Sequence, residues 1–466
     1  MPIETLPIRE IHAAEGSWTL RGGRVVCPAN GIDAQRDVRV ANGKITAIEP
    51  PNCMPPDAGD VDVSGAIVVP GLIDLHVHTA QAMSSYGACA DRNGIASGVC
   101  HVNDMAGTGW LSANVLRAYS KLCTTSLSGT MYVAGAGNPE NWVLGCPEIC
   151  DASTNEELLQ GAIEANRDLF TSIKVHVDLG FMALYGADPL RGFWVARRVS
   201  KKLGIPLYLH LGLLGPHDGH LESQFGSLLA EVIGALAPGD IIGHVLSPWP
   251  GTPLDTNQAV WSELLSRDDL YWEVGHGLNL CFDRARRWLQ SGRPLLISSD
   301  AHLRYGHLGK LHEGKLRHQA GPLNAYTLVG TMSKLRALGF SLHDVVRGAS
   351  CTPARALGLQ DRMGELTVGR SANITVLENR TGDFTYRDSV GKTLQTDCIL
   401  MPRMTALGGR LWQLFPDQLE EFSAELGADN DGDATDRPGL PGLQGAVVTR
   451  QPPPGSQTIN PQHDWH

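Results

Sequence analysis

The feature that most constrains the fold is an alternation of short apolar runs with longer helical stretches between residues 70 and 358. Strand-like runs that alternate with helical stretches indicate βαβ units, whose strands pair in parallel. Seven or eight units over about 290 residues favour a closed barrel over an open sheet. We therefore predict an α/β fold with a TIM-like (β/α)8 barrel at residues 70–358. The apolar runs are residues 67–78, 130–134, 172–177, 206–211, 240–245, 270–274 and 294–299.

Both flanks of this region are rich in extended segments. Asn42-Gly43 lies between two of them and is a hairpin signal, because both residues tolerate a positive φ. We predict that residues 1–69 and 359–414 together form one small β-sandwich domain beside the barrel. Residues 415–466 are predicted to be a C-terminal extension, disordered from about residue 427, where the chain becomes rich in Asp, Gly, Pro and Gln.

The composition is typical of a globular intracellular chain. Hydrophobic residues make up 42% of the 466 residues, and the net charge of −11 argues against a broad nucleic-acid-binding surface. The ten cysteines have irregular spacings, which favours a reduced compartment over a disulfide scaffold. No signal-peptide pattern and no apolar stretch of roughly 18 residues is present. We expect a soluble, cytoplasmic protein that binds neither nucleic acid nor a membrane.

Two histidines end the first apolar run, which reads Pro-Gly-Leu-Ile-Asp-Leu-His-Val-His over residues 70–78. Positions i and i+2 of a strand face the same side, so His76 and His78 would direct both imidazoles to one place, as two ligands of one metal ion must. With 17 histidines in 466 residues, roughly 0.6 His-x-His patterns arise by chance. The pair alone is therefore more often structural than metal-binding.

Later apolar runs also contain, or end in, polar residues of metal-binding type. Lys174 lies within Ser-Ile-Lys-Val-His-Val, where a lysine is costly unless it is neutralised, paired or able to snorkel. His210, His244 and Asp300 each end a separate run. The carboxyl ends of barrel strands converge on one face, where active sites form. Six such residues in order along the chain are hard to attribute to chance, and they predict a metal site at that face.

These motifs resemble those of the amidohydrolase superfamily of metal-dependent hydrolases, over about residues 18–412. Lys174, Gly275-His276 and residues 384–391 (Phe-Thr-Tyr-Arg-Asp-Ser-Val-Gly) are most similar to the dihydroorotase-like deacetylases, which include acetyl-mandelate esterases. The resemblance extends to thiocarbamate and phenylurea hydrolases. The sequence departs from the deacetylase pattern at Asn373, where an acidic residue is usual, and at residues 211–220. Both departures concern the substrate rather than the metal centre.

The resemblance implies a centre with two divalent ions and a chemically modified lysine. A hydroxide shared by the two ions would attack a carbonyl group, and an aspartate would take up its proton and return it to the leaving group. Imidazole and carboxylate ligands suit Zn, Co, Mn or Fe. The implied ligands are His76, His78 and Asp300 for one ion, His210 and His244 for the other, and Lys174 as a bridging carbamate formed with carbon dioxide.

Three further histidines are candidates with two open interpretations each. His176 shares a strand face with Lys174 and would either orient the carbamate or simply pack there. His276, in Val-Gly-His-Gly, resembles a substrate-lining position of the deacetylases, and a packing role is equally open. His302, two residues beyond Asp300, would line the pocket or belong to a loop.

The sequence supports three classes of function. The first is a hydrolase that cleaves an amide, carbamate, urea or ester bond of a small molecule. The second is a metal-dependent deaminase of the same superfamily, although such enzymes generally use one ion and lack the bridging lysine. The third is a non-catalytic assembly protein on the same fold, although such proteins lose metal ligands that this chain retains. The resemblance also implies a homo-oligomer.

Overall fold

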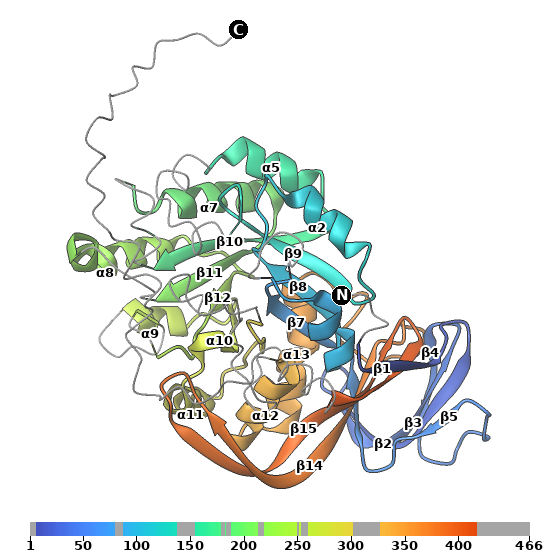
Figure 1. The fold of residues 1–466 in the computed structure, drawn as a ribbon. Coiled ribbons are helices and arrows are strands. Elements are labelled where there is room, and N and C mark those ends of the chain that lie inside the picture. Colours follow the sequence, from blue (N-terminus) through green and yellow to red (C-terminus); the bar gives the residue numbers. More distant parts are fainter. Residues whose placement is uncertain are drawn as a thin grey trace, which may run out of the picture.

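The computed structural model describes residues 6–79, 87–137, 154–178, 182, 188–212, 219–248, 251–252, 260–301 and 327–416 (Figure 1). Two sheets organise these residues, one parallel and one mixed. The predicted C-terminal extension lies outside the described residues apart from its first two positions, and no helix among the described residues is long and apolar enough to cross a membrane.

The parallel sheet has seven strands in the order β13-β12-β11-β10-β9-β8-β7, the reverse of their order along the chain. Such an order arises when each strand pairs with the next through a helical crossover. The strands are β7 (Leu72–Val77), β8 (Val99–Met105), β9 (Ser126–Tyr132), β10 (Phe170–Asp178), β11 (Leu207–Gly212), β12 (Ile241–Gly243) and β13 (Tyr271–Trp272).

A short segment near residue 300 closes this sheet. Leu296 forms a parallel bridge with Glu273, next to β13, and Ala301 forms a parallel bridge with Val77 of β7. The segment therefore pairs with both edges of the sheet and takes the place of an eighth strand. The prediction of an α/β fold with a TIM-like barrel is confirmed.

Helices cover the outside of the barrel (Figure 1). Several begin at a side chain that accepts a backbone N–H of the first turn, as Asn155, Thr327 and Ser341 do. The described helices are α1 (Ala90–Asn93), the 3-10 helix η2 (Ile95–Ser97), α2 (Ala113–Ser120), α5 (Glu156–Glu164), α7 (Arg191–Leu203), α8 (Gly219–Gly234), α9 (Val260–Leu265), α10 (His276–Asn279), α11 (Phe282–Ser291), α12 (Leu328–Ala337), α13 (Leu342–Ala349) and α14 (Cys351–Ala356).

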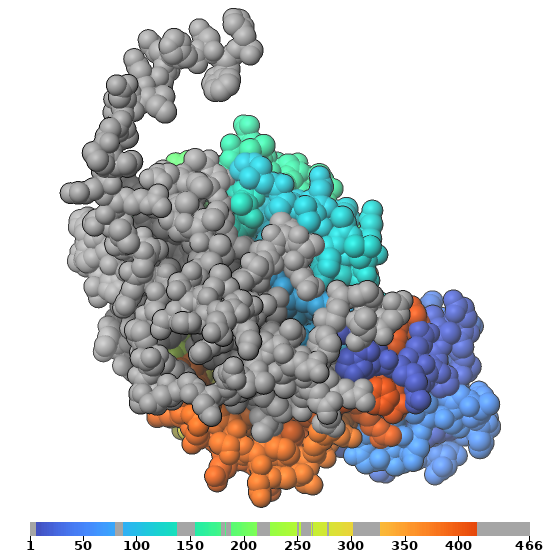
Figure 2. Space-filling view, viewed as in Figure 1, coloured from blue at the N-terminus to red at the C-terminus, as the bar shows by residue number. Residues whose placement is uncertain are grey.

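The second sheet joins the two flanks of the chain. Its nine strands run in the order β1-β16-β15-β14-β6-β2-β3-β4, with β5 paired to β2. In the space-filling view the early strands, in blue, lie beside the late strands, in orange to red (Figure 2). The strands are β1 (Ile8–His12), β2 (Ser17–Cys27), β3 (Ile32–Ala41), β4 (Lys44–Glu49), β5 (Asp60–Asp62), β6 (Ile67–Pro70), β14 (Ile374–Arg387), β15 (Thr393–Leu407) and β16 (Arg410–Leu414).

The run predicted as one strand at residues 67–78 is divided between the two sheets. β6 belongs to the second sheet and β7 to the barrel, and Gly71 stands between them. A Cβ at Gly71 would lie 2.6 Å from Sγ of Cys100 and 3.0 Å from the backbone of Asn373. A glycine therefore lets the chain pass closely between the sheets at this point.

Strand β8 is absent from the predicted apolar runs because its inward-facing positions are polar. Within Val99–Met105, His101 and Asn103 are buried and replace the expected apolar side chains. The His101 ring contacts the Ser126 and Ser128 hydroxyls at 2.9 Å each, which satisfies it inside the barrel. Because these buried positions are polar, β8 does not appear in the sequence as a run of apolar residues.

Strands β14 and β15 form a long hairpin that reaches from the second sheet to the barrel (Figure 1). Near its middle, the Ser333 hydroxyl of α12 donates to the Leu400 carbonyl of β15 at 3.3 Å, and the Leu400 amide donates back at 2.9 Å. At its tip, the Asp388 carboxylate accepts the Phe282 amide at 3.0 Å. The hairpin thus contacts the chain segment that follows β13.

Candidate functional site

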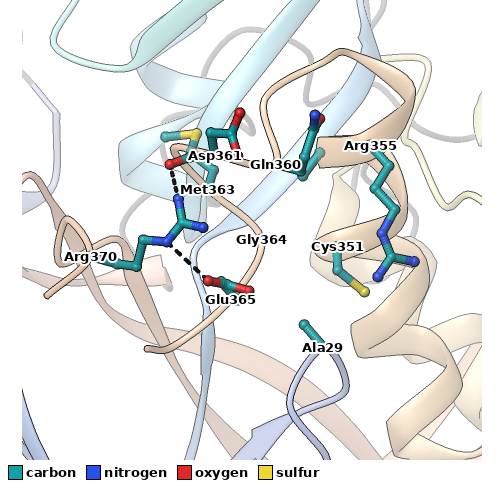
Figure 3. Close-up of a pocket in the computed structure, with 10 residues that line it drawn as sticks. Ala29, Cys351, Arg355, Gln360, Asp361, Met363, Gly364, Glu365 and Arg370 are labelled. Atoms are coloured by element: carbon teal, nitrogen blue, oxygen red, sulfur yellow. Dashed lines mark hydrogen bonds and ion pairs between the residues drawn. The ribbon is translucent and has the colours of Figure 1, made fainter. Parts of the chain in front are cut away.

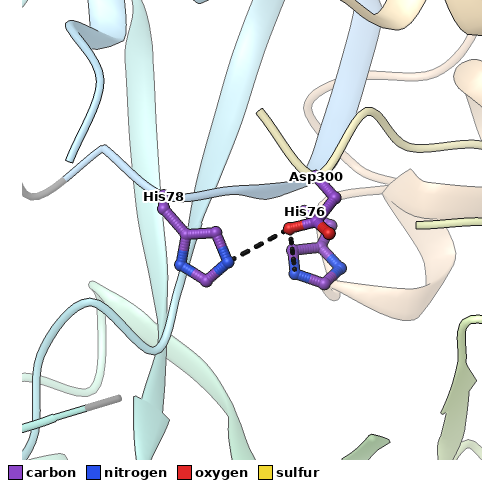
Figure 4. A group of neighbouring side chains, drawn as sticks. All are labelled: His76, His78 and Asp300. Carbon is purple, nitrogen blue, oxygen red and sulfur yellow. Dashed lines mark ion pairs between the residues drawn. The ribbon is translucent and has the colours of Figure 1, made fainter. Parts of the chain in front are cut away.

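The side chains at the carboxyl end of β7 face an aspartate from the closing segment. Nε2 of His76 and Nε2 of His78 each lie 3.2 Å from the same oxygen, Oδ1 of Asp300 (Figure 4). Asp300 adopts a φ of 52°, which aspartate tolerates better than most residues. Its backbone amide donates to the His76 carbonyl at 2.8 Å. The closing segment therefore brings a carboxylate onto the two histidines that the sequence singles out.

The opposite nitrogen of the His76 ring is held by two groups from other strands. Nδ1 lies 2.9 Å from the Tyr208 hydroxyl of β11 and 3.1 Å from Oε1 of Glu273. The same hydroxyl donates to Oε2 of Glu273 at 2.9 Å. Both partners fix the ring plane, so Nε2 of His76 points to Asp300. This arrangement is the one by which carboxylates orient metal-binding histidines.

Glu273 is a site residue that sequence reasoning missed. It is fully buried, it accepts the Ser298 hydroxyl and the His244 amide, and burial raises its pKa to about 7. The signal was present in the sequence, because Glu273 interrupts the apolar run at residues 270–274 as Lys174 interrupts its own run. Burying a carboxylate within a strand costs free energy, as burying a lysine does, unless the group is paired or neutralised. Glu273 could therefore have been singled out for the same reason as Lys174.

His244 and His210 lie next to each other beyond β12 and within β11. Their ring centroids are 4.2 Å apart, and the centroids of His244 and His76 are 5.1 Å apart. Nδ1 of His244 lies 3.0 Å from the Gly275 carbonyl, which orients the ring. Gly275 has a φ of 48°, and a Cβ there would collide with Nδ1 of His244, so this position requires glycine.

Lys174 lies on the inner face of β10 and is 2% exposed. Burial lowers its pKa to about 8, against the opposing influence of nearby carboxylates, with Asp300 and Glu273 the largest. Nζ lies 5.3 Å from the centre of the Tyr208 ring. The structure thus places Lys174 among the same groups that surround His76, as an amine that loses its proton more readily than an ordinary lysine.

Of the three further candidate histidines, two are buried in the described part of the chain and one lies outside it. His176 is buried on β10, with Nδ1 3.2 Å from Oδ2 of Asp178. His276 is buried at the start of α10, with Nε2 2.8 Å from Nζ of Lys334. Lys334 is a second lysine whose pKa burial lowers, to about 7, and sequence reasoning missed it because it lies on a helix. His302 lies outside the described residues.

The donor set fits divalent metal ions. Three groups of side chains place their ligand atoms within 4.8 Å of one another: His76 with His78 and Asp300; His76 with His244 and Glu273; and His176 with Asp178 and His210. Both ring nitrogens of His210 are buried without a hydrogen-bond partner in the described part of the chain. Buried nitrogen atoms of this kind are costly unless an ion or another ligand binds them.

A surface cavity of about 240 Å³ lies elsewhere, between α14 and the second sheet. In Figure 3, Cys351 and Arg355 project from α14, while Arg370 extends between Glu365 and Asp361. Nε of Arg370 forms an ion pair with Glu365 at 3.1 Å. None of the histidines described above lines this cavity. The candidate site is therefore the cluster of buried histidines and carboxylates, and not this cavity.

Asn373, the departure from the deacetylase pattern, has a structural role. Its Oδ1 accepts the Gly408 amide at 3.0 Å, and its Nδ2 donates to the Arg362 carbonyl at 3.2 Å. Both contacts join segments around the second sheet, away from the histidine cluster. The other departure, residues 211–220, lies largely outside the described residues.

Comparison with known proteins gives consistent matches. Residues 282–401 match the model of the amidohydrolase family. A deacetylase of Enterococcus faecalis is 24% identical over 357 residues, which cover 75% of this chain and 87% of that protein. The structure of an adenine deaminase is 22% identical, with a TM-score of 0.69, over 85% of this chain and 99% of that chain. The structure of a dihydroorotase is 20% identical, also with a TM-score of 0.69, over 85% of this chain and 98% of that chain. At these identities the structural likeness shows a shared fold.

Proposed function

The chain belongs to the amidohydrolase superfamily and is a hydrolytic enzyme for carbon–nitrogen bonds, and we propose that it removes an acyl group from a small-molecule amide or ester with the help of divalent metal ions. The observation that carries this proposal is the convergence of two histidines on one aspartate oxygen at the carboxyl end of β7. The deacetylase of Enterococcus faecalis supports an acyl group as the part removed.

The residues that would hold the ions are those whose ring nitrogens are oriented toward the centre. Glu273 and Tyr208 occupy Nδ1 of His76, and the Gly275 carbonyl occupies Nδ1 of His244, so Nε2 is the ligand atom in both rings. We assign His76, His78 and Asp300 to one ion, and His210 and His244 to the other. Bound divalent ions supply a Lewis acid for the substrate carbonyl and lower the pKa of a water molecule.

Lys174 is the proposed bridge between the two ions. Its burial, with no ion pair to a carboxylate among the described residues, favours the neutral amine, and the neutral amine is the form that reacts with carbon dioxide. The amine would form a bond to the carbon of carbon dioxide and release one proton, and the resulting carbamate would offer two anionic oxygens as ligands for divalent cations. The modification would thus change a buried amine into an anionic ligand.

Asp300 is the proposed proton carrier. One of its oxygens, Oδ1, faces both His76 and His78, and Asp300 is 7% exposed, more than any of the four histidines assigned as ligands. A carboxylate in this position can accept a proton from an attacking water molecule and deliver it to the departing amine or alcohol. Its backbone is fixed by the His76 carbonyl, so the carboxylate does not need to move far between the two steps.

The two other functional classes are less well supported. Deaminases of the superfamily generally lack a bridging lysine, whereas Lys174 lies buried within the cluster. A non-catalytic assembly protein has no need for buried ring nitrogens such as those of His210. A homo-oligomer and a cytoplasmic location remain proposals from the sequence.

Metal analysis combined with a substrate panel tests the proposed function. We expect two equivalents of divalent metal per chain, and hydrolysis within a panel of acetylated amino acids, cyclic imides, carbamates and aryl ureas assayed with added Zn, Co or Mn. Lys174→Ala should lose turnover and at least one equivalent of metal, whereas His101→Asn, which alters a buried histidine satisfied by two serines, should retain both. A folded wild-type chain that binds no metal would overturn the proposal.

A further inference from the structure

The histidines assigned as metal ligands differ in how their rings are held. Nδ1 of His76 contacts Glu273, and Nδ1 of His244 contacts the Gly275 carbonyl. Neither ring nitrogen of His210 has a hydrogen-bond partner among the described residues. Rotation about the bond to an imidazole ring has broad energy wells, so a ring without such a partner needs another constraint to keep its orientation.

The constraint on His210 is a stacked ring. His176 of β10 pairs in register with His210 of β11, and the two imidazoles stack with centroids 4.5 Å apart and planes inclined by 15°. This geometry is that of a favourable ring pair. The ring plane of His210 cannot turn without losing this contact.

His176 is itself held on two sides. Its Nδ1 lies 3.2 Å from Oδ2 of Asp178, the residue two positions further along the same strand face. The ring of Tyr132, on β9, meets the His176 ring edge-on, with centroids 5.7 Å apart and planes at 82°. The stack is therefore anchored in the barrel wall by three neighbouring strands, β9, β10 and β11.

We propose that His176 is a positioning residue that fixes the ring plane of His210 by stacking, in place of the hydrogen bonds that orient the rings of His76 and His244. The proposal rests on the proposed function, because it gives the ring of His210 a metal ion to bind. It differs from a role of His176 in holding the carbamate of Lys174, and from a role as a further metal ligand. Stacking needs only a flat ring, whereas both other roles need a ring nitrogen.

Replacement of His176 by phenylalanine or leucine separates these roles. Phenylalanine keeps a flat ring and has no nitrogen, and leucine has neither. Both variants are made together with Asp178→Asn, so that no buried carboxylate loses its imidazole partner. Asp178→Asn alone is the parent, and His101→Leu is the control for loss of a buried histidine elsewhere in the barrel. The readouts are the affinity of the metal-free chain for Co²⁺, followed by the absorption of the bound ion, and the metal content at saturation.

We expect the leucine variant to bind the more weakly held of two Co²⁺ ions about 10- to 100-fold less tightly than its parent, the usual effect of losing an orienting neighbour. The phenylalanine variant should stay within about three-fold of the parent. Equal weakening in both variants would overturn the stacking role in favour of a nitrogen-dependent one, and unchanged affinity in both would overturn any role. A wild-type chain that binds no Co²⁺ would instead contradict the proposed function.

Discussion

The Glu273 carboxylate lies 3.1 Å from Nδ1 of His76, and both side chains are fully buried. Glu273→Leu removes this acceptor and leaves the ring of His76 oriented by Tyr208 alone. We expect the affinity for metal to fall about 10- to 100-fold, because partners behind a ligand histidine set both its tautomer and its orientation. Glu273→Gln keeps an acceptor oxygen and should retain more affinity than Glu273→Leu. The measurement is metal retention during dialysis against increasing chelator.

The control for this prediction is Asp269→Asn. Asp269 lies before β13, on the other side of that strand from Glu273. It is exposed and pairs with Arg267, so its loss should leave metal retention unchanged. Equal retention by Glu273→Leu and the wild type would show that Tyr208 alone holds the His76 ring.

Asp300→Asn separates proton transfer from folding. Asparagine matches the shape of aspartate and, like it, tolerates the positive φ of 52° at this position. The amide cannot accept a proton from water, so we expect turnover to fall about 10²- to 10⁴-fold with no loss of folded protein. Steady-state kinetics at saturating metal, with the melting temperature as the folding control, provide the test. A variant with near-wild-type turnover would exclude Asp300 as the proton carrier.

Much of the barrel and of its site could be predicted from the sequence, because apolar strands ending in His, Lys or Asp carry their own signal. His76, His78 and Asp300 are far apart in the sequence and meet because barrel strands end on one face. The strand β8 carried no such signal, because buried His101 and Asn103 bond to hydroxyls of the next strand.

The groups behind the proposed ligands were harder to predict. Glu273 and Tyr208 act on His76 through side-chain geometry that spacing does not reveal. Lys334 lies on a helix, where a lysine ordinarily faces solvent, and only the packing of α12 against β15 shows that it is buried. The residues that orient the histidines are thus defined by contacts between distant segments of the chain, which the sequence pattern does not show.

The tip of the β14–β15 hairpin supports the segment between α10 and α11. The Asp388 carboxylate accepts the amides of Phe282, Val390 and Lys392 at 2.8–3.0 Å, and it is 6% exposed. Asp388→Ala leaves these donors without their acceptor, and we expect a loss of about 1–3 kcal/mol in the free energy of unfolding. Denaturant unfolding measures the loss.

Lys392→Ala is the matched control at the same hairpin tip. It removes the exposed ion pair with Asp283 and keeps the Lys392 backbone amide, so stability should change little. If Lys392→Ala cost as much stability as Asp388→Ala, the exposed ion pair would contribute as much to the hairpin tip as the buried carboxylate, contrary to this prediction.

Lys334 should make stability depend on pH. Burial lowers its pKa from 10.5 to about 7, with Asp388 opposing the shift, and its Nζ contacts His276 beneath the ring of Tyr386. Between pH 7 and 10.5 the unfolded chain holds a proton that the folded chain has released, so the contribution of Lys334 to the free energy of unfolding rises with pH. Lys334→Met removes this titration and keeps the apolar stem.

We therefore expect the Lys334→Met variant to gain most relative to the wild type near pH 7, where the wild-type chain bears the cost of the buried amine, and to lose that advantage toward pH 10. Denaturant unfolding of the metal-free proteins at several pH values gives the difference directly, because other titrating groups are common to both chains. Lys392→Met, at an exposed lysine, should show no such trend. Parallel profiles for Lys334→Met and the wild type would mean that Lys334 keeps its ordinary proton affinity in the folded chain.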